Sequence, residues 1–245
     1  MKYVLEFVAT LCTSIFAGAS LYITFVEHPA RMQCGTEVAT AEFGPSYRRA
    51  TAMQASLAIG AFLAAVGAWW LSRAPIWLIG GVLIGAVVPF TLIVILPTNK
   101  KLLDPGVSQD PDLAGKLLSR WGKLHAVRTV LSAVALVVLL LATALAAQDH
   151  IVESKEAKLR QDLFVLREEI QQYTVDKQKE PQSLDDLIQG GYIREIPKDP
   201  ITGKADWIPD MDDAGSWLDQ VEPGIWYVHS RSEQTALDGT KYSDW

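Results

Sequence analysis

The sequence predicts a membrane all-α four-helix bundle joined to a small soluble α+β domain. Four runs without any charged residue are each long enough to cross the hydrocarbon core of a bilayer, which takes about 20 residues; they cover residues 7–26, 50–72, 74–98 and 129–147. Charge changes where the last run ends. Residues 1–148 carry 11 Lys and Arg against 7 Asp and Glu, whereas residues 149–245 carry 11 against 21. Such asymmetry indicates a membrane part followed by an acidic soluble part.

We therefore expect two domains, a membrane domain at 1–148 and an extracytoplasmic domain at 149–245. The membrane domain has four predicted spans, at about 4–27, 50–72, 75–97 and 124–147. The first is a retained span rather than a signal peptide, because bulky and aromatic residues follow it in place of a small-residue cleavage site. Pro89 should kink the third span. With no Gly or Pro near the end of the fourth, we expect one helix from about 124 to about 175, continuous with the long helix of the soluble domain.

Positive charges beside the spans predict the orientation, because Lys and Arg are concentrated in cytoplasmic loops. The connections after the first and third spans hold most of them: Arg31, Arg48, Arg49, Lys100, Lys101, Lys116, Arg120 and Lys123. The sequence thus favours a multi-pass protein of a bacterial inner (cytoplasmic) membrane. Its N-terminus and its acidic domain are expected on the periplasmic side.

Polar residues gather where the spans meet this inner face. The stretches "VEHPAR" and "RWGKLHAVR", together with the end of the third span, supply the candidate catalytic residues Glu27, His28, Asn99, Trp121, His125 and Arg128. Ionisable side chains at the bilayer are costly, so they are candidates for an acid/base or anion-holding pocket. The alternative is structural, since charged groups at helix ends also reach headgroups or pair with one another. No H-E-x-x-H pattern supports a metal at these residues.

The same stretches resemble a known family. "GASLYITFVEHPAR", "FGPSYRRATAMQASLAI", "PFTLIVILPTNKKLL" and "RWGKLHAVRTVLS" are similar, in order, to the four-helix membrane family labelled anthrone oxygenase-like. The resemblance covers roughly residues 1–147 and implies the four-helix fold. It also implies, for some members, cofactor-independent oxygenation of polycyclic phenols, with the six candidate residues above as the site.

The soluble part begins with an amphipathic helix. Its apolar residues recur at spacings of three and four: Leu159, Leu163, Leu166, Ile170 and Tyr173. A short helix follows in "SLDDLIQ", with Ser183 as its expected cap. The stretch "GIWYVHS" is the clearest strand. The tryptophans of this part are expected to pack rather than to form ligand cages: Trp207, Trp217, Trp226 and Trp245.

This order resembles the major pseudopilin (G-type) of type II secretion systems. The residues that carry the match are "LREEIQQYTVDKQKEPQSLDDLIQGGYIREIPKDPITG" and "GIWYVHSRSEQTALDGTKYSDW". The resemblance implies a calcium site in the C-terminal loop, for which the candidate ligands are Ser230, Ser232, Glu233 and Asp238; the alternative is a solvated acidic turn. The basic leader and cleavage site of a pseudopilin do not precede the fourth run, which leaves filament assembly open.

Two functions follow from these observations. The first is that of an accessory protein, embedded in membrane lipid, that presents its acidic domain to protein partners outside the membrane, with calcium as the ion expected to stabilise that domain. The second is a membrane oxygenase acting on an aromatic or quinone-like substrate, with His28 and His125 as acid/base residues. The acidic domain argues against nucleic acid as a partner. The sequence contains no phosphate-binding loop, nucleophile elbow or haem-attachment motif, so calcium is the one cofactor that we expect.

Overall fold

The structure is a computed structural model that describes residues 1–212 and 223–245. The chain divides into two compact units, Met1–Ala146 and Ala147–Trp245. Trp217 lies outside the described residues. Four helical segments are long and apolar enough to cross a membrane, and they lie between Lys2 and Lys177. The chain is therefore a multi-pass membrane protein.

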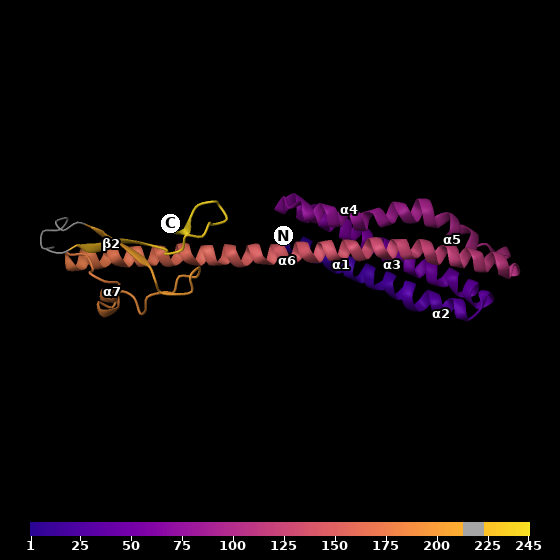
Figure 1. Cartoon of the computed structure of the whole chain (residues 1–245), viewed down its shortest axis with the longest axis horizontal. Helices are drawn as coiled ribbons and strands as arrows, with labels where there is room; N and C mark the ends of the chain where they lie inside the picture. The colour runs from indigo at the N-terminus through magenta and orange to yellow at the C-terminus, as the bar shows by residue number, and fades with distance from the viewer. Residues whose placement is uncertain (213–222) are drawn as a thin grey trace. The chain divides into compact units, whose positions relative to one another are not determined.

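Unit 1 is a bundle of four helical segments, two of which contain a π-helical turn (Figure 1). The first segment comprises α1 (Lys2–Tyr22), the π-helix η1 (Ile23–Glu27) and α2 (His28–Gln33). The second is α3 (Thr36–Ser72). The third comprises α4 (Pro75–Phe90), the π-helix η2 (Thr91–Ile95) and α5 (Leu96–Leu102). A 3-10 helix, η3 (Pro105–Gln109), then leads into α6 (Pro111–Lys177).

Two helices begin earlier than the sequence predicts. We expected the second and fourth spans to start at about 50 and 124, but α3 starts at Thr36 and α6 at Pro111. The residues before position 50 have a reason to be helical, since Ala39 and Phe43 are buried in the bundle. The start of α6 is fixed by Pro111 at its first position and by Asp110, whose Oδ1 accepts the Leu113 N–H at 3.0 Å. Both features are typical of helix N-termini.

The kink expected at Pro89 takes the form of a π-helical turn. Pro89 lies in the last turn of α4, and η2 begins two residues later. A proline has no N–H to donate, so the regular α-helical hydrogen bonds are interrupted at that point. In η2 the bonds instead span five residues, a local change that is common at functional sites.

Small residues let the helices of unit 1 approach closely, as is usual between membrane helices. A Cβ added to Gly80 of α4 would lie 2.5 Å from Leu139 Cδ2 of α6. One added to Gly81 would lie 2.9 Å from the Ala65 Cβ of α3. The backbone of α4 therefore lies close to side chains of both neighbouring helices. The polar residues of the bundle are grouped elsewhere.

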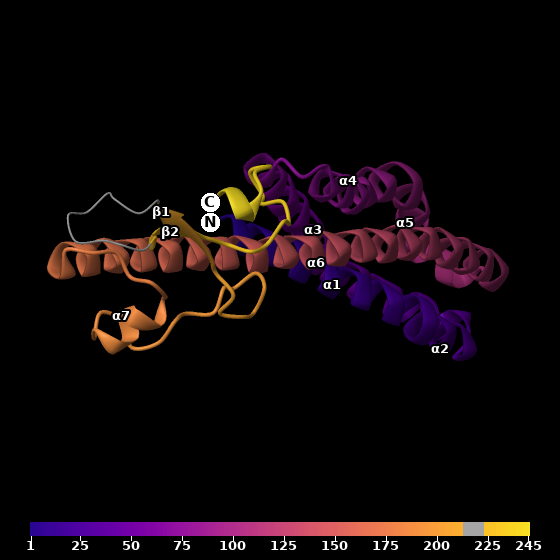
Figure 2. The ribbon, with the colours of Figure 1, turned by 60° about the vertical axis from the view of Figure 1, so that its left-hand side comes forward.

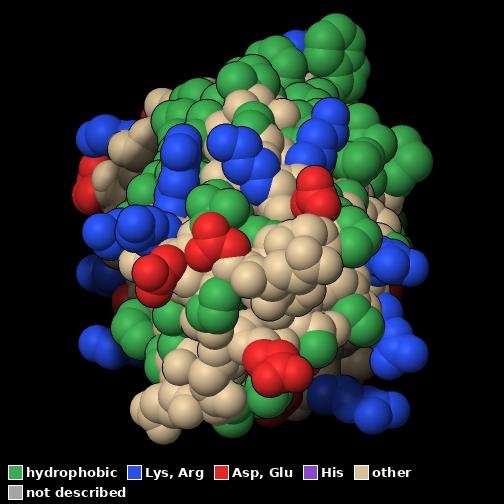
Figure 3. All heavy atoms as spheres, turned by 90° about the vertical axis from the view of Figure 1, so that its right-hand side faces the viewer, with side chains coloured by type: hydrophobic (Ala, Val, Ile, Leu, Met, Phe, Trp, Pro, Cys, Tyr) green, Lys and Arg blue, Asp and Glu red, His purple; other side chains and the backbone are tan. Residues whose placement is uncertain are grey.

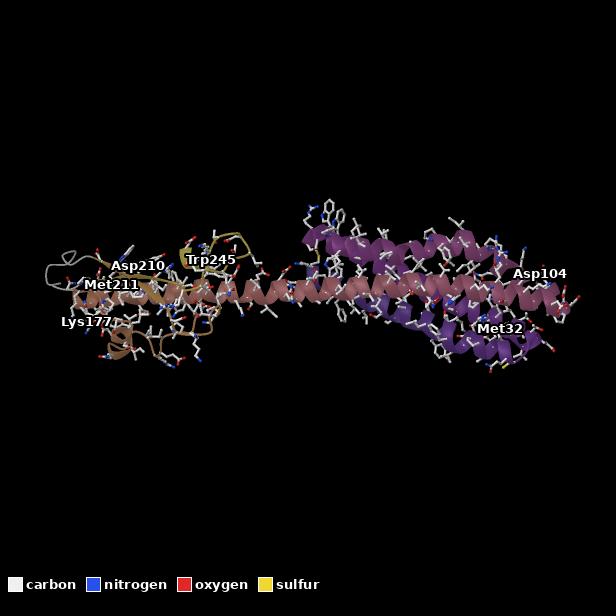
Figure 4. All side chains as sticks on the ribbon, viewed as in Figure 1. Met32, Asp104, Lys177, Asp210, Met211 and Trp245 are labelled. Carbon is white, nitrogen blue, oxygen red and sulfur yellow. The ribbon has the colours of Figure 1, made fainter. Side chains whose placement is uncertain are left out.

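One end of unit 1 carries most of its positive charge. Met32 and Asp104, labelled in Figure 4, mark this end, where α2 and α5 lie. Figure 3 looks onto it and shows Lys and Arg side chains around the face, with fewer Asp and Glu. The exposed cations of the segments that meet here are Arg48, Arg49, Lys100, Lys101, Lys116, Arg120 and Lys123. It is the end that the sequence predicts to face the cytoplasm.

Unit 2 folds around the last part of α6, from residue 147 to Lys177. The remaining elements are α7 (Asp185–Gln189), the antiparallel strands β1 (Ile208–Asp212) and β2 (Gly224–His229), and the 3-10 helix η4 (Tyr242–Asp244). Figures 1 and 2 show α7 and the strand pair on different sides of α6. The pair starts with Ile208 opposite His229 and has an irregularity between Asp210 and Met211.

The predicted apolar face of the long helix is confirmed. Leu159, Leu163, Leu166 and Ile170 are buried in one cluster with residues of α7, β2 and η4. The short helix and the strand are also where the sequence predicts them, but the expected cap is wrong. Leu184 rather than Ser183 precedes α7, and the Asp186 carboxylate accepts the Gln182 and Ser183 N–H groups at 2.8 and 3.1 Å. The Asp186 carboxylate thus fixes the residues before the helix, and the N-cap makes no side-chain hydrogen bond to the first turn.

Candidate functional site

The polar residues of unit 1 surround a cavity of about 120 Å³ inside the bundle. All four helical segments contribute to its wall. Five of the six candidate residues line it: Glu27, Asn99, Trp121, His125 and Arg128. The remainder of the wall is mostly apolar and comes from α1, α3, α4 and η2. The arrangement is a small apolar cavity with one polar side, which is the usual form of a small-molecule site.

Glu27 is held at one edge of the cavity by two groups. The buried Arg31, one turn further along the chain, donates to its Oε1, and the Ser46 hydroxyl of α3 donates to the same oxygen at 3.1 Å. The Arg31 guanidinium also pairs with Glu42 and lies 5.7 Å from the centre of the Trp121 ring. Arg31 thus lies between the two carboxylates, and its charge-assisted contacts fix the orientation of Glu27 at the edge of the cavity.

His125 is oriented by a network of hydroxyl groups. Its Nδ1 lies 3.0 Å from Thr24 Oγ1, and its Nε2 lies 3.2 Å from Arg128 Nη2. A guanidinium can only donate, so Nε2 must accept and the hydrogen of the neutral ring must be on Nδ1. The Thr24 hydroxyl therefore accepts from the ring, and it lies 2.8 Å from the Thr129 hydroxyl. His125 is thus fixed as one tautomer in the cavity wall.

Arg128 links His125 to α3. Its Nη2 donates to Gln54 Oε1 and its guanidinium lies 5.3 Å from the centre of the Phe16 ring. Because Arg128 must be the donor, the Gln54 oxygen faces it and the Gln54 Nε2 is directed elsewhere. That buried Nε2 has no hydrogen-bond partner among the described residues, and neither has the Nε of Arg128. Two donors are therefore available beside the cavity.

Asn99 supplies a free acceptor on the same wall. The residue is 1% exposed and lies in α5, which follows η2 directly. Its Oδ1 is buried without a hydrogen-bond partner among the described residues. Buried polar atoms are nearly always satisfied, and exceptions call for a functional or water-mediated explanation. Asn99, Gln54 and Arg128 together give one acceptor and two donors next to an apolar space.

His28 does not line the cavity. Its ring packs on Trp121, with the ring centres 5.2 Å apart, and against Gly122 of α6, where an added Cβ would lie 2.4 Å from His28 Nε2. Trp121 also packs on His125, with ring centres 4.8 Å apart. The two histidines named as acid/base candidates therefore contact the same indole, and of the two only His125 reaches the cavity wall.

Several residues of the site were not among the sequence candidates. Gln54 stands in the uncharged run of the second span, where a lone amide was an available signal. Thr24 and Thr129 also lie within or beside apolar runs, and Thr129 follows His125 by four residues, on the same helical face. Hydroxyl groups are common in membrane helices because they can bond to their own backbone, as Thr129 does to the His125 carbonyl at 3.0 Å. Their contribution to the site depends on tertiary contacts that sequence spacing does not contain.

The predicted calcium ligands of unit 2 bind other protein groups. Ser230 donates to Asp199 at 2.6 Å, and Ser232 Oγ accepts from the Gln234 N–H. The other two are ion-paired or hydrogen-bonded nearby: Glu233 with Lys241 at 2.8 Å, and Asp238 with Thr240 at 2.6 Å. These contacts hold the pKa of Glu233 and of Asp238 below their usual values. Calcium takes six to eight oxygens at once, and here they would have to include hydroxyl and main-chain oxygens, because no cluster of three or more His, Cys, Asp or Glu side chains in the described part of the chain could hold a metal. The calcium site stays a prediction.

Comparison with known proteins finds a similarity between part of unit 1 and one family. Residues 43–138 match the family model described as anthrone oxygenase. This stretch contains Gln54, Asn99, Trp121, His125 and Arg128, whereas Glu27 precedes it. No curated protein and no solved structure matches the chain, and the pseudopilin resemblance of residues 149–245 stays a prediction. Over residues 43–138, then, this membrane protein is similar to the anthrone oxygenase family.

Proposed function

We propose that unit 1 binds a phenolic or quinone-like small molecule in the cavity of the bundle. The observation that carries the proposal is that three buried polar atoms of cavity-lining residues have no hydrogen-bond partner among the described residues: Asn99 Oδ1, Gln54 Nε2 and Arg128 Nε. Leaving each of them unpaired costs about 1–3 kcal/mol. A bound ligand that completes their hydrogen bonds recovers that free energy, which gives the site affinity and orientation.

The complementary ligand group is an oxygen on an aromatic or quinonoid ring. A phenolic hydroxyl can donate to Asn99 Oδ1 while it accepts from Gln54 Nε2, and a quinone carbonyl can accept from both donors. The ring itself fits among the apolar and aromatic side chains of the wall, which include Phe16, Phe43 and Trp121. The cavity of about 120 Å³ is close to the roughly 150 Å³ of an engineered cavity that binds benzene. Its size therefore favours one ring, and a polycyclic phenol would need the helices to separate.

Binding can be tested on the full chain in lipid nanodiscs with p-cresol as the probe. We expect p-cresol to raise the melting temperature of the protein. The Gln54→Met variant keeps the side-chain length but loses the amide, and we expect it to lose this shift. Gln33→Met is the control, because it makes the same change at an exposed position. A shift that is absent from the unaltered protein, or equal in both variants, would contradict the proposal.

We propose oxygenation as a second candidate function, because the family model that matches residues 43–138 is described as anthrone oxygenase. In that reaction a ring CH₂ activated by a neighbouring carbonyl loses a proton, and the carbanion is oxidised by O₂. One oxygen atom enters the product as a carbonyl and the other leaves as water, so that CH₂ plus O₂ gives C=O plus H₂O. Glu27, whose carboxylate lines the cavity, is the proposed proton acceptor. His125 is the positioning residue, since its Nε2 is engaged by Arg128.

Oxygenation predicts one O₂ consumed per molecule of product, with one atom of isotopically labelled O₂ in the new carbonyl. Glu27→Gln should lower turnover of an anthrone substrate by at least about 100-fold, the usual scale for loss of a general base, while it leaves the p-cresol melting shift in place. Turnover by Glu27→Gln equal to that of the unaltered protein would remove Glu27 from the reaction. If the protein binds p-cresol but takes up no O₂, unit 1 is a binding site and not an oxygenase.

The interaction role of unit 2 is a separate proposal. We infer that α6 is one uninterrupted helix that joins the bundle to an acidic outer domain, which is presented to a protein partner. The bounds of α6, Pro111–Lys177, support this continuity. Purification of the full chain from native membranes, followed by mass spectrometry, should recover a larger assembly. Recovery of the protein alone would argue against the accessory role.

A further inference from the structure

We propose that the ligand of unit 1 carries a hydrocarbon chain, and that this chain lies in an apolar groove between α3 and α4. The groove has a volume of about 410 Å³ and is a different space from the cavity. Its wall consists of apolar residues of these two helices, among them Ile59, Phe62, Val82 and Ala86. The inference deepens the proposed function, because it assumes that the ring binds in the cavity.

The groove adjoins the cavity. Ala58 of α3 and Val88 of α4 line both spaces, so a molecule with its ring among the polar residues can extend past them into the groove. Gly85, which also lines the groove, lets the Phe62 ring pack directly against α4, since an added Cβ would lie 2.8 Å from Phe62 Cδ2. The groove thus continues the cavity along α3 and α4, away from the residues that hold Glu27.

The surroundings of the groove define the chemistry of its occupant. Ile59 and Val82 are half exposed on helices that cross the membrane, so the groove opens toward lipid chains. It offers almost no polar surface to a ligand. The residues of the adjoining cavity have polar atoms without partners in the described part of the chain, and a plain lipid chain would leave them unsatisfied. The two spaces together fit an amphipathic molecule with one oxygenated ring and an alkyl or isoprenoid-like chain.

The route between the spaces is also consistent with the packing of the third segment. α3 packs closely along α4, whereas η2 makes its main contacts with α4 and α5. Leu92 of η2 lines the cavity and is 58% exposed. Leu92 thus borders both the cavity and the lipid-facing surface of η2. A membrane-dissolved ligand can enter sideways there without passing through water.

The proposal is tested by photolabelling the full chain in nanodiscs. The probe is 4-decylphenol with a diazirine in its chain, and labelled peptides are identified by mass spectrometry. We expect labels on the groove residues of α3 and α4, and we expect excess p-cresol to abolish them. The Ala86→Phe variant fills the groove, so unlabelled 4-decylphenol should bind to it, and compete with the probe, about tenfold more weakly than in the unaltered protein. A tenfold loss of affinity is of the same size as the usual free-energy cost of overpacking one site. It should leave the melting shift caused by p-cresol unchanged.

Ala52→Phe is the matched control, since Ala52 is exposed on α3 and lines neither space. It should behave as the unaltered protein with both phenols. If p-cresol removes labels that lie on α1 or α6, the chain does not bind in the groove, and this proposal is wrong. The ring would still bind in the cavity. Groove labels that p-cresol does not remove would show lipid-like adsorption and also overturn the proposal. If p-cresol neither competes nor shifts the melting temperature, the proposed function itself fails.

Discussion

Asn99 is an amide buried in a membrane helix, and its oxygen has no partner among residues 1–212 and 223–245. It should therefore lower the stability of the protein. We expect Asn99→Leu, which has the same number of side-chain heavy atoms and the same branching, to raise the free energy of unfolding by about 1 kcal/mol, because an unsatisfied buried polar group is removed. The same variant should lose the p-cresol melting shift. Thermal unfolding of the full chain in nanodiscs, with and without p-cresol, measures both effects.

A variant that is less stable than the unaltered protein would show that Asn99 has a structural partner. Opposite effects on stability and on binding are expected of a residue that is retained for its ligand. The Gln54→Met variant gives an independent check at the other side of the cavity. If Gln54→Met changes the stability only slightly, the Gln54 amide donates to the ligand and not to another group of the protein.

Tyr242 provides a pH-dependent contact in unit 2. The residue is buried and its hydroxyl donates to Glu156 Oε1 at 2.9 Å. Burial and the neighbouring carboxylate raise the pKa of Tyr242 to about 12, above its ordinary value of about 10. The contact therefore stabilises the fold below pH 10, and its contribution is lost as the pH rises from 10 through 12.

We expect the unfolding temperature of unit 2 in the full chain to fall over that alkaline range. The Tyr242→Phe variant cannot ionise there, so it should be less stable at neutral pH and should show a smaller alkaline fall. Circular dichroism melts at a series of pH values measure this difference. Equal alkaline losses in the two proteins would assign the titration to another group.

Among the elements, α4 depends on glycine for its contacts. Gly80→Ala should destabilise the bundle by about 1–3 kcal/mol, the usual cost of overpacking, because the added methyl would meet Leu139 of α6. Gly18→Ala in α1 is the control, since an added Cβ there has no neighbour within 4 Å. Melting temperatures of both variants decide the point. An equal loss in the two would show that helix flexibility, and not the approach of α4 to α6, is the cause.

The element pattern was largely predictable from the sequence, while the ends of elements and the site were predictable only in part. Uncharged runs identify the four spans, since only an apolar helix can cross lipid. They do not identify the start of α3, because Ala39 and Phe43 are buried by neighbours that the sequence cannot place. Glu27, Asn99 and His125 stood out as polar residues at span ends. Gln54 did not, because its role comes from Arg128, 74 residues further along the chain.

At the scale of the whole molecule, the orientation in the membrane is open to a direct test. The chain has two cysteines, of which Cys34 is exposed and follows α2 at the cation-rich end of unit 1. If that end faces the cytoplasm, a membrane-impermeant maleimide should modify Cys34 in inverted vesicles and leave it unmodified in intact spheroplasts. Cys34→Ser is the control for labelling of Cys12. Modification in spheroplasts would reverse the predicted topology.

The proposed continuity of α6 makes a second prediction at this scale. An uninterrupted helix should protect its amide hydrogens from exchange throughout residues 140–160, on both sides of the boundary between the units. Rapid exchange confined to a few residues near 147 would show a break. Hydrogen–deuterium exchange with mass spectrometry of the full chain measures this protection. The exposed loops of unit 2 serve as the internal reference for fast exchange.

The two π-helical turns predict how relatives that share this cavity differ in sequence from relatives that do not. Each turn contains one residue more than an α-helix would need, and one residue corresponds to about 100° of rotation. η1 precedes Arg31 and η2 precedes Asn99, so the direction of both side chains depends on an inserted residue. A relative without the insertion would direct its equivalent of Asn99 to another side of the bundle. Single-residue gaps at 23–27 and 91–95 in an alignment should therefore separate proteins that share this cavity from those that share only the four helices.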